Sequence, residues 1–152
     1  MSGALTHSPA DILQALLVAL GLGSQPPGPT DPAVTWPVFV ASEPAAPDEA
    51  ITTYDTEGRD FGFTMTDGER QEHHGVQVRV RASTHAVGWK KARAIAVALD
   101  ESVYQETVVI EGVSYFVHDV IRTSNVIPLG KEEPTSKRTL FTINAVVTLH
   151  QS

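Results

Sequence analysis

The last part of the sequence carries the pattern that most restricts the fold. From residue 139 to residue 149, eleven residues have apolar side chains at every second position from Phe141 to Leu149, opposite Thr142, Asn144 and Thr148. Alternation with a period of two is typical of a strand that buries one face, and this strand is longer than the usual length of about five or six residues. We expect one end of it to project beyond the sheet, where a neighbouring molecule can use it. The buried face is predicted to carry Phe141, Ile143, Ala145, Val147 and Leu149.

A second alternating segment and a helical segment predict the remainder of the core. Residues 76–81 place three valines on one face of a strand and Gln77, Arg79 and Arg81 on the other, so both arginines are expected to be exposed. Residues 84–100 have apolar side chains at helical spacing. The buried stripe of that helix is predicted to contain Trp89, Ala92, Ile95, Ala96 and Leu99.

The other segments complete a single predicted domain, residues 1–152. A helix at 9–20 begins after the N-cap Ser8, and a proline-rich loop at 21–35 precedes an α+β core at 36–149. Short strands are expected at 36–40 and 51–54, a loop at 55–75, and a hairpin around Glu111-Gly112. Strand residues then continue to about residue 126, and a charged loop at 128–137 leads into the final strand. The predicted fold is α+β: a mixed, mostly antiparallel sheet with two main helices packed on one face and a long C-terminal β-hairpin.

Charge and composition exclude several classes of protein. The net charge is −7, and residues 1–58 contain seven acids and no Lys or Arg. This balance disfavours strong non-specific binding to nucleic acid. The chain has no cysteine, which excludes disulfides and thiol chemistry, and no apolar run near the roughly 20 residues that cross a bilayer. We expect a soluble protein that works inside a cell and needs no cofactor.

The candidate sites for chemistry are weak. His73, His74 and His85 are the one metal-like group, but adjacent histidines converge poorly on a strand, so a solvated loop is favoured. A hydrolytic triad would need His118, Asp119 and Ser124, yet the first two would point to opposite faces of a strand.

Three further patterns have simpler explanations. The carboxylates of Asp55, Glu57 and Asp60 are expected to be solvated in a loop. The glycines of 21–23 follow a helix, whereas a phosphate-binding turn follows a strand. The basic side chains that could read DNA are balanced by acids in the same region, so ion pairs between subunits or solvated faces are favoured. Nothing in the sequence predicts an active site.

An ordered set of short motifs resembles a known family. It comprises WPVFV (36–40), Pro47-Asp48, YDTEGR (54–59), HGVQVRVR (74–81), WKKA (89–92), IAVAL (95–99), RTS (122–124), IPLG (127–130), Arg138 and FTINA (141–145). Taken in order, these motifs resemble the minor capsid and tail terminator proteins of long-tailed (siphovirus-like) bacteriophages. The resemblance extends from the first helix to Leu149.

The resemblance implies a structural virion protein and not an enzyme. Proteins of this family form a ring, commonly a hexamer, at the head-proximal end of the tail tube. The ring ends polymerisation of the tube and docks the tail to the head-completion or connector proteins. DNA passes through the opening non-specifically. The implied location is the tail-neck junction of the virion, after assembly in the host cytoplasm. The alternatives are another neck protein, for head-tail joining or tail completion, and a small-molecule-binding or metal-dependent enzyme.

Two sets of residues are assigned to this assembly as hypotheses. The set expected to contact a neighbouring subunit or the tube is Arg79, Arg81, Pro128, Leu129, Lys131, Glu132, Glu133, Lys137 and Arg138. The set expected at the lumen or rim of the ring is Asp48, Glu49, Asp55 and Glu57. Acids close to the duplex would repel its phosphates and let it slide, an effect that decays over about 8 Å at physiological salt.

Overall fold

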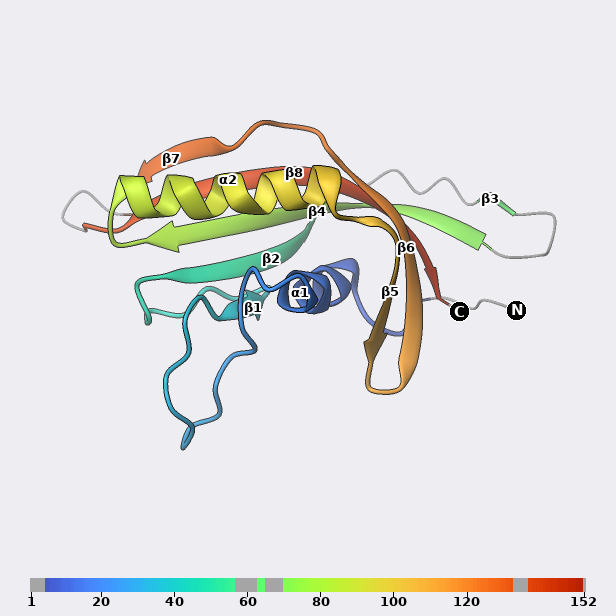
Figure 1. Cartoon of the computed structure of the whole chain (residues 1–152), viewed down its shortest axis with the longest axis horizontal. Coiled ribbons are helices and arrows are strands. Elements are labelled where there is room, and N and C mark those ends of the chain that lie inside the picture. Colours follow the sequence, from blue (N-terminus) through green and yellow to red (C-terminus); the bar gives the residue numbers. More distant parts are fainter. Residues whose placement is uncertain (1–4, 57–62, 65–69, 133–136, 152) are drawn as a thin grey trace.

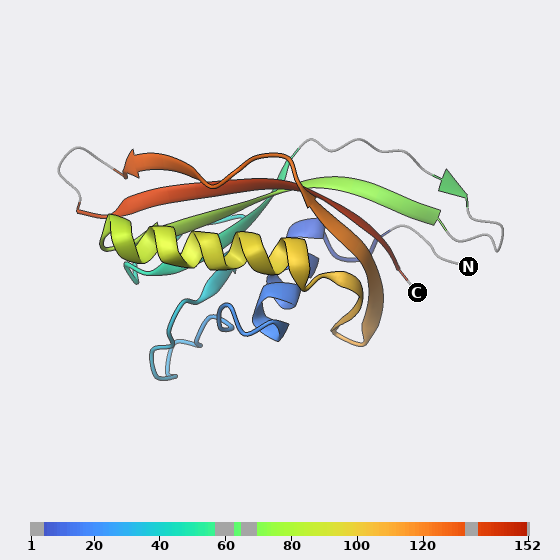
Figure 2. The ribbon, with the colours of Figure 1, turned by 45° about the horizontal axis from the view of Figure 1, so that its top comes forward.

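The protein is an α+β fold in which one curled sheet carries both helices on the same face (Figures 1 and 2). The computed structural model describes residues 5–56, 63–64, 70–132 and 137–151. In these residues the sheet has eight strands, and its pairings are antiparallel except for one parallel pair, β1 with β2. The predicted fold class is confirmed.

The strands do not follow their chain order across the sheet. The order is β1-β2-β4-β8-β6-β5, with β3 beside β4 and β7 beside β8. The elements are α1 (Pro9–Ala19), β1 (Val38–Val40), β2 (Ala50–Thr56), β3 (Phe63–Thr64), β4 (Arg70–Ala82), α2 (His85–Glu101), β5 (Tyr104–Ile110), β6 (Val113–Arg122), β7 (Ile127–Lys131) and β8 (Thr139–Gln151).

The two long strands β4 and β8 form the centre of the sheet. Val80 lies opposite Phe141 and Val78 lies opposite Ile143, so the apolar sides of the two strands coincide. This side, the helix face, packs against α1 and α2 in one core that extends from Ile12 to Leu149. The opposite side of the sheet is called the outer face.

Helix α1 begins at a capping box. The Ser8 hydroxyl accepts a hydrogen bond from the Asp11 N–H, and the Asp11 carboxylate accepts one from the Ser8 N–H, as this helix start predicts. A third contact comes from β2, where Asp55 Oδ1 accepts from the Ala10 N–H at 2.9 Å. An acid near the positive end of the helix dipole stabilises this orientation.

Helix α2 approaches the sheet closely because Gly88 has no side chain. A Cβ at this position would lie 2.5 Å from Cε2 of Phe141. Gly88 therefore occupies the buried stripe at the point where the sequence predicted Trp89, which is instead 44% exposed on the flank of the helix. The prediction of a buried Trp89 was wrong, although Ala92, Ile95, Ala96 and Leu99 are buried as expected.

The predicted turn between β5 and β6 is confirmed. Glu111 has φ of 50° and Gly112 has φ of 80°. Two successive positive φ values are those of the primed turns whose twist matches a hairpin. The hairpin curls away from the plane of the central strands (Figure 2).

The structure corrects two predicted loops. Residues 70–75 continue β4, because 70–71 pair with β3 and 72–75 pair with β8, where Glu72 lies opposite Leu149. Residues 127–131 form β7 on the edge of β8, where Pro128 is tolerated because an edge strand has a side that needs no donor. In the proline-rich segment Ser24 forms an isolated parallel bridge with Pro37, and the Asp31 N–H donates to the Gly28 carbonyl oxygen.

In the part of the chain that the structure describes, neither helix is long and apolar enough to cross a membrane.

Candidate assembly interface

The loop between β1 and β2, residues 41–49, is held to the sheet by arginines. Arg79 Nη1 lies 3.6 Å from Glu43 Oε2. Arg81 Nη2 donates a hydrogen bond of 2.7 Å to the carbonyl oxygen of Pro47. Both arginines come from β4 and project on the outer face, as the alternation of that strand requires. We call residues 41–49 the arginine-held loop.

A third arginine joins this loop to the β7–β8 hairpin. Arg138 Nη1 donates to the carbonyl oxygen of Ala45 and lies 3.7 Å from Asp48 Oδ1. Arg138 Nη2 lies 2.8 Å from Glu132 Oε1 at the other side of the hairpin end. The hairpin end is closed by a hydrogen bond from the Glu132 N–H to the Arg138 carbonyl oxygen. One guanidinium therefore ties together three segments of the chain.

These contacts correct the expected exposure of Arg81. The residue is 1% exposed, because the arginine-held loop covers it, whereas the sequence predicted an exposed side chain. Arg79 is partly exposed and its guanidinium lies 5.3 Å from the centre of the Tyr54 ring. Burial and the nearby Glu43 raise the pKa of Tyr54 above its ordinary value. The structure thus gives both arginines partners within their own chain.

The other predicted contact residues are placed around β7. Pro128, Leu129, Lys131 and Lys137 are exposed, and Glu132 is half-buried against Arg138. Glu133 lies outside the described residues. All five residues of β7 are exposed, including Ile127 and Leu129. The hairpin therefore presents apolar side chains on an uncovered strand.

Two of the four acids assigned to the lumen, Glu49 and Asp55, make hydrogen bonds that hold the fold. Asp48 is exposed near Arg138, and Glu49 Oε1 accepts a hydrogen bond from the Ser83 hydroxyl. Asp55 holds the start of α1, as described above. Glu57 lies outside the described residues. Arg138, from the set expected at an interface, thus contacts Asp48, from the set expected at the lumen.

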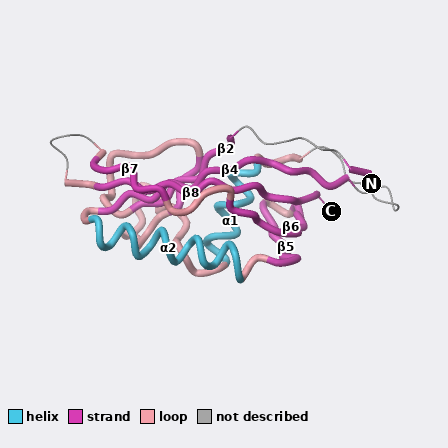
Figure 3. The backbone as a smooth tube through the Cα atoms, turned by 90° about the horizontal axis from the view of Figure 1, so that it is seen from above, coloured by secondary structure: helices cyan, strands magenta, loops and turns pink. Residues whose placement is uncertain are grey.

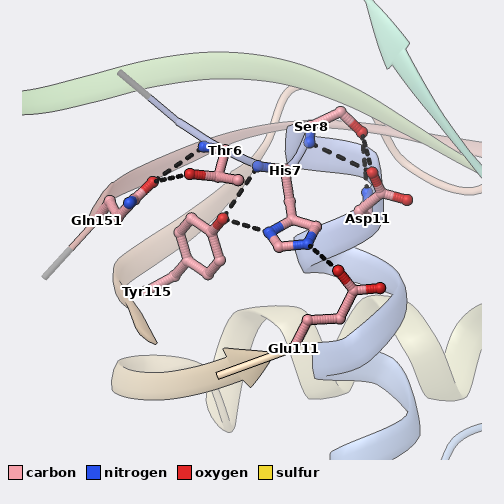
Figure 4. A network of polar contacts seen from close by, with 7 residues as sticks. All are labelled: Thr6, His7, Ser8, Asp11, Glu111, Tyr115 and Gln151. Carbon is pink, nitrogen blue, oxygen red and sulfur yellow. Dashed lines mark hydrogen bonds and ion pairs between the residues drawn. The ribbon is translucent and has the colours of Figure 1, made fainter. Parts of the chain in front are cut away.

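A polar network ties the residues before α1 to three other segments (Figure 4). The Tyr115 hydroxyl accepts from the His7 N–H at 3.0 Å and is hydrogen-bonded to Nδ1 of the same histidine. His7 Nε2 lies 3.5 Å from Glu111, and the Thr6 N–H donates to Gln151 Oε1. The row of Glu, His and Tyr has the order of a proton relay, but Tyr115 is fully buried. The network therefore anchors the chain, and the hydroxyl at its centre is buried.

An open hollow of about 500 Å³ lies beside this network, between α1 and the β5–β6 turn. Its polar lining includes His7, Asp11, Gln14 and Glu111. Asp11 is engaged in the capping box and His7 in the Tyr115 contact, so two of these groups already serve the fold.

The residues considered for a hydrolytic triad do not assemble one. A bulge between Val117 and Asp119 inserts His118, whose Nε2 lies 2.9 Å from His150 Nδ1 on the outer face. Asp119 is on the same face, so the prediction that it opposes His118 was wrong because of the bulge. The Ser124 hydroxyl accepts from the backbone N–H of Asn144.

The three histidines considered for a metal are also separated. Nδ1 of His73 contacts the Thr148 hydroxyl on the outer face, whereas His74 lies opposite Val147 on the helix face. His85 stands at the start of α2 against the Phe141 ring. Among the described residues no group of three or more His, Cys, Asp or Glu could hold a metal ion.

Sequence reasoning missed a group of exposed apolar residues on the β5–β6 hairpin. Tyr104, Val109 and Ile121 are 72%, 60% and 60% exposed, the largest values for large apolar side chains in the described chain. The available signal was charge, because residues 101–121 contain four acids and no Lys or Arg. Of these acids, Asp119 is the one on the outer face with Tyr104 and Ile121, because Glu101 belongs to α2, Glu106 lies opposite the buried Val117 and Glu111 contacts His7.

Comparison with known proteins assigns no family. No protein-family model matches the sequence, and no curated protein matches it. Solved structures do match. One of them aligns over 77% of this chain and 79% of its own, at 14% identity and a TM-score of 0.40. A similarity at this level assigns neither a family nor a function.

Proposed function

We propose that this chain is a structural virion protein, the tail terminator of a long-tailed bacteriophage. In this role it forms a ring on the head-proximal end of the tail tube, ends the polymerisation of the tube and gives the head-completion proteins a docking surface. The proposal rests first on the ordered motifs from WPVFV (36–40) to FTINA (141–145).

The observation that carries the proposal is the uncovered strand β7. All its residues are exposed, with Ile127 and Leu129 at 37% and 47%. An exposed strand with apolar side chains invites pairing or aggregation unless a partner covers it. A subunit that docks on the end of a tube needs such a surface.

The positions of the polar side chains support a structural role. Side chains of the types that often act in catalysis, such as His118, Asp55 and Tyr115, make hydrogen bonds to other parts of the fold. Arg138 keeps the hairpin end and the arginine-held loop in fixed relation. Rigid presentation of a hairpin suits a docking element, because little conformational entropy is lost on binding.

The direct test uses the purified chain and tail tube subunits of the same virus. Negative-stain images of the chain alone are expected to show rings with a central opening. Added to polymerising tube subunits, the chain is expected to shorten the tubes and to appear at one end of each. Unchanged tube lengths with no density at the tube ends would contradict the proposal.

A matched pair of variants links this activity to β7. Leu129→Asp puts a charge on the exposed strand and is expected to abolish capping of the tube. Asn125→Asp adds the same charge at an exposed position four residues earlier and is expected to cap normally. Unaltered capping by Leu129→Asp would show that β7 is not the docking element.

Cryo-EM of particles, which locates the protein, separates a terminator from another neck protein.

A further inference from the structure

The loop between α1 and β1 projects from the molecule and adds little to its core. Residues 25–35, which we call the proline loop, contain four prolines, and nine of the eleven residues are exposed. The nearest residues along the chain that pack against the described core are Leu22 and Trp36. Binding residues are often found on exposed loops that a rigid scaffold holds in place. The proline loop has the exposure that such a role requires.

The base of the proline loop is closed by backbone hydrogen bonds. The Ser24 N–H donates to the Trp36 carbonyl oxygen, and the Val38 N–H donates to the Ser24 carbonyl oxygen, both at 2.9 Å. Gly23 permits this closure, because a Cβ there would lie 2.8 Å from the Trp36 carbonyl oxygen. A compact surface loop of about 6–16 residues with adjacent ends is an Ω-loop, a type that frequently serves function.

Two side-chain contacts attach the same base to both helices. Gln14 Nε2 on α1 donates to Gln25 Oε1 at 2.9 Å. The Lys91 ammonium on α2 lies 5.3 Å from the centre of the Trp36 ring. A cation at this distance from an aromatic ring is attracted to it. The base of the loop is therefore fixed to α1, α2 and the sheet edge at β1.

The tip of the proline loop is a defined turn. The Asp31 N–H donates to the Gly28 carbonyl oxygen at 3.1 Å, and Asp31 Oδ2 accepts from the Gly28 N–H at 3.0 Å. Pro29 occupies the second position of this turn, where its fixed φ is favoured. The other three prolines also fix their own φ and restrict the residue before each. A loop with so few available conformations loses little entropy when it binds a partner.

The proline loop and β7 lie at opposite edges of the molecule. In Figures 1 and 2 the loop, drawn in blue, extends from the lower edge, whereas β7 lies at the upper edge. Figure 3 looks down on this upper edge, where β7 lies beside β8. One partner on the loop and another on β7 can therefore be bound at the same time.

We propose that the proline loop binds the head-completion protein, in a groove that is lined with aromatic side chains and edged with basic ones. Exposed prolines in a preformed conformation are the segments that aromatic-lined grooves recognise. Asp31 is the one charged residue among 25–35, and a basic edge of the groove complements it. The inference rests on the proposed function, which assigns β7 to the tail tube, and it identifies the element that meets the opposite partner.

The first test replaces residues 26–32 by a Gly-Ser segment of the same length in the whole chain. The contacts at the base lie outside the replaced residues, so circular dichroism and urea unfolding are expected to match the wild type. Rings and capping of the tail tube are also expected to be normal, since β7 is unchanged. Tails that end in this variant are mixed with purified heads of the same virus. They are expected to give at least about 30-fold fewer infectious particles, the loss typical of removing a binding hot spot.

A second variant separates the charge of the loop from its shape. Asp31→Asn keeps an acceptor for the Gly28 N–H and removes the negative charge, so the turn is expected to be retained. Head joining is expected to fall about 2- to 5-fold and to depend less on salt than in the wild type. Glu101→Gln removes the same charge at an exposed position on α2 and is expected to join heads normally. Wild-type joining and salt dependence in Asp31→Asn would overturn the basic edge of the groove.

A cross-link identifies the partner directly. Because the chain has no cysteine, Thr30→Cys places a single thiol at the tip of the loop for attachment of a benzophenone maleimide. After irradiation of assembled particles, mass spectrometry is expected to find this probe joined to the head-completion protein, next to aromatic residues. Ser102→Cys, at an exposed position after α2, is the control and is expected to give no cross-link to that site.

The outcomes separate this inference from the proposed function. Normal head joining by the Gly-Ser variant would overturn the inference and leave tail termination in place. Cross-links from position 30 to the tube protein or to a second copy of this chain would do the same. A wild-type chain that leaves tube lengths unchanged would instead overturn the proposed function. The two failures are therefore measured in different assays.

Discussion

Arg122 donates two hydrogen bonds to the Asp100 carboxylate, from Nε to Oδ1 at 2.9 Å and from Nη2 to Oδ2 at 2.7 Å. The pair ties the last turn of α2 to β6. The hydrogen bonds from Arg122, and then the charges of Arg122 and Arg93, hold the pKa of Asp100 below its ordinary value. The charge of Asp100 is therefore matched within the chain.

The first prediction concerns the pH dependence of this pair. Because the pKa of Asp100 is lowered in the folded state, its contribution is complete above the unfolded pKa of about 4 and is lost as the pH falls through the folded pKa. Asp100→Asn is expected to reduce the free energy of unfolding by about 1 kcal/mol or less at pH 7, since the pair is partly exposed. In urea titrations this difference from the wild type should shrink below pH 4. Glu101→Gln is the control, and a difference that is constant with pH would contradict the prediction.

The second prediction concerns the buried Arg81. Arg81→Ala leaves the Pro47 carbonyl without its donor and opens a cavity, so the free energy of unfolding is expected to fall by about 2–4 kcal/mol. Arg79→Ala, at a partly exposed ion pair, is expected to cost about 1 kcal/mol or less. Hydrogen exchange should be faster in the arginine-held loop of Arg81→Ala. Equal stability losses in the two variants would show that burial does not distinguish these arginines.

The third prediction concerns Gly88. Alanine normally favours a helix over glycine by about 1 kcal/mol, but overpacking a core costs about 1–3 kcal/mol. Because a Cβ here would meet the buried Phe141 ring, Gly88→Ala is expected to lower the midpoint of urea unfolding. Phe141→Leu should reduce the penalty in a double-mutant cycle. A more stable Gly88→Ala protein would contradict the close packing of α2.

The fourth prediction separates assembly from stability at the hairpin. Lys131→Glu and Lys137→Glu are expected to impair ring or tail-end assembly with little change in stability, because both side chains are exposed. Arg138→Glu is expected to lower stability too, since it breaks contacts with the arginine-held loop. Tail length in particles and urea unfolding measure the two effects, with Lys131→Arg and Lys137→Arg as controls. Particles of normal tail length from the Glu variants would refute the assembly role.

The fifth prediction concerns orientation in the ring. Asp48, Glu49, Asp55 and Glu57 are expected to lie nearer the ring axis than Lys90, Lys91 and Arg93. A cryo-EM map of the tail end measures these radii directly. The reverse order would place the acidic segment on the outside of the ring, where it serves solubility alone.

The long periodic segments could be predicted from the sequence because their patterns are local. The face of β8 that carries Phe141 and Ile143 was predicted correctly, as was the turn at Glu111-Gly112. β7 could not be predicted, because Pro128 and Gly130 indicate a loop until the neighbouring strand β8 is known. The polar start of β4 likewise becomes a strand through its pairing with β8.

The site was harder to predict than the fold because exposure depends on what covers a face. Alternation correctly placed Arg81 on the outer face, but it carried no information about the loop that buries it. The exposed position of Trp89 depends on Gly88, which takes the contact with Phe141.

The arginine-held loop also sets how far its negative charge can act. Glu43 and Asp48 each have a guanidinium within 4 Å, so a passing duplex meets paired charges and not isolated ones. The potential of such a pair falls with the square of distance in a uniform medium, whereas that of a single charge falls with distance itself, and salt shortens both. Any repulsion of phosphates by this part of a ring would therefore operate at short range, guiding a duplex that touches the wall while leaving one at the centre undisturbed.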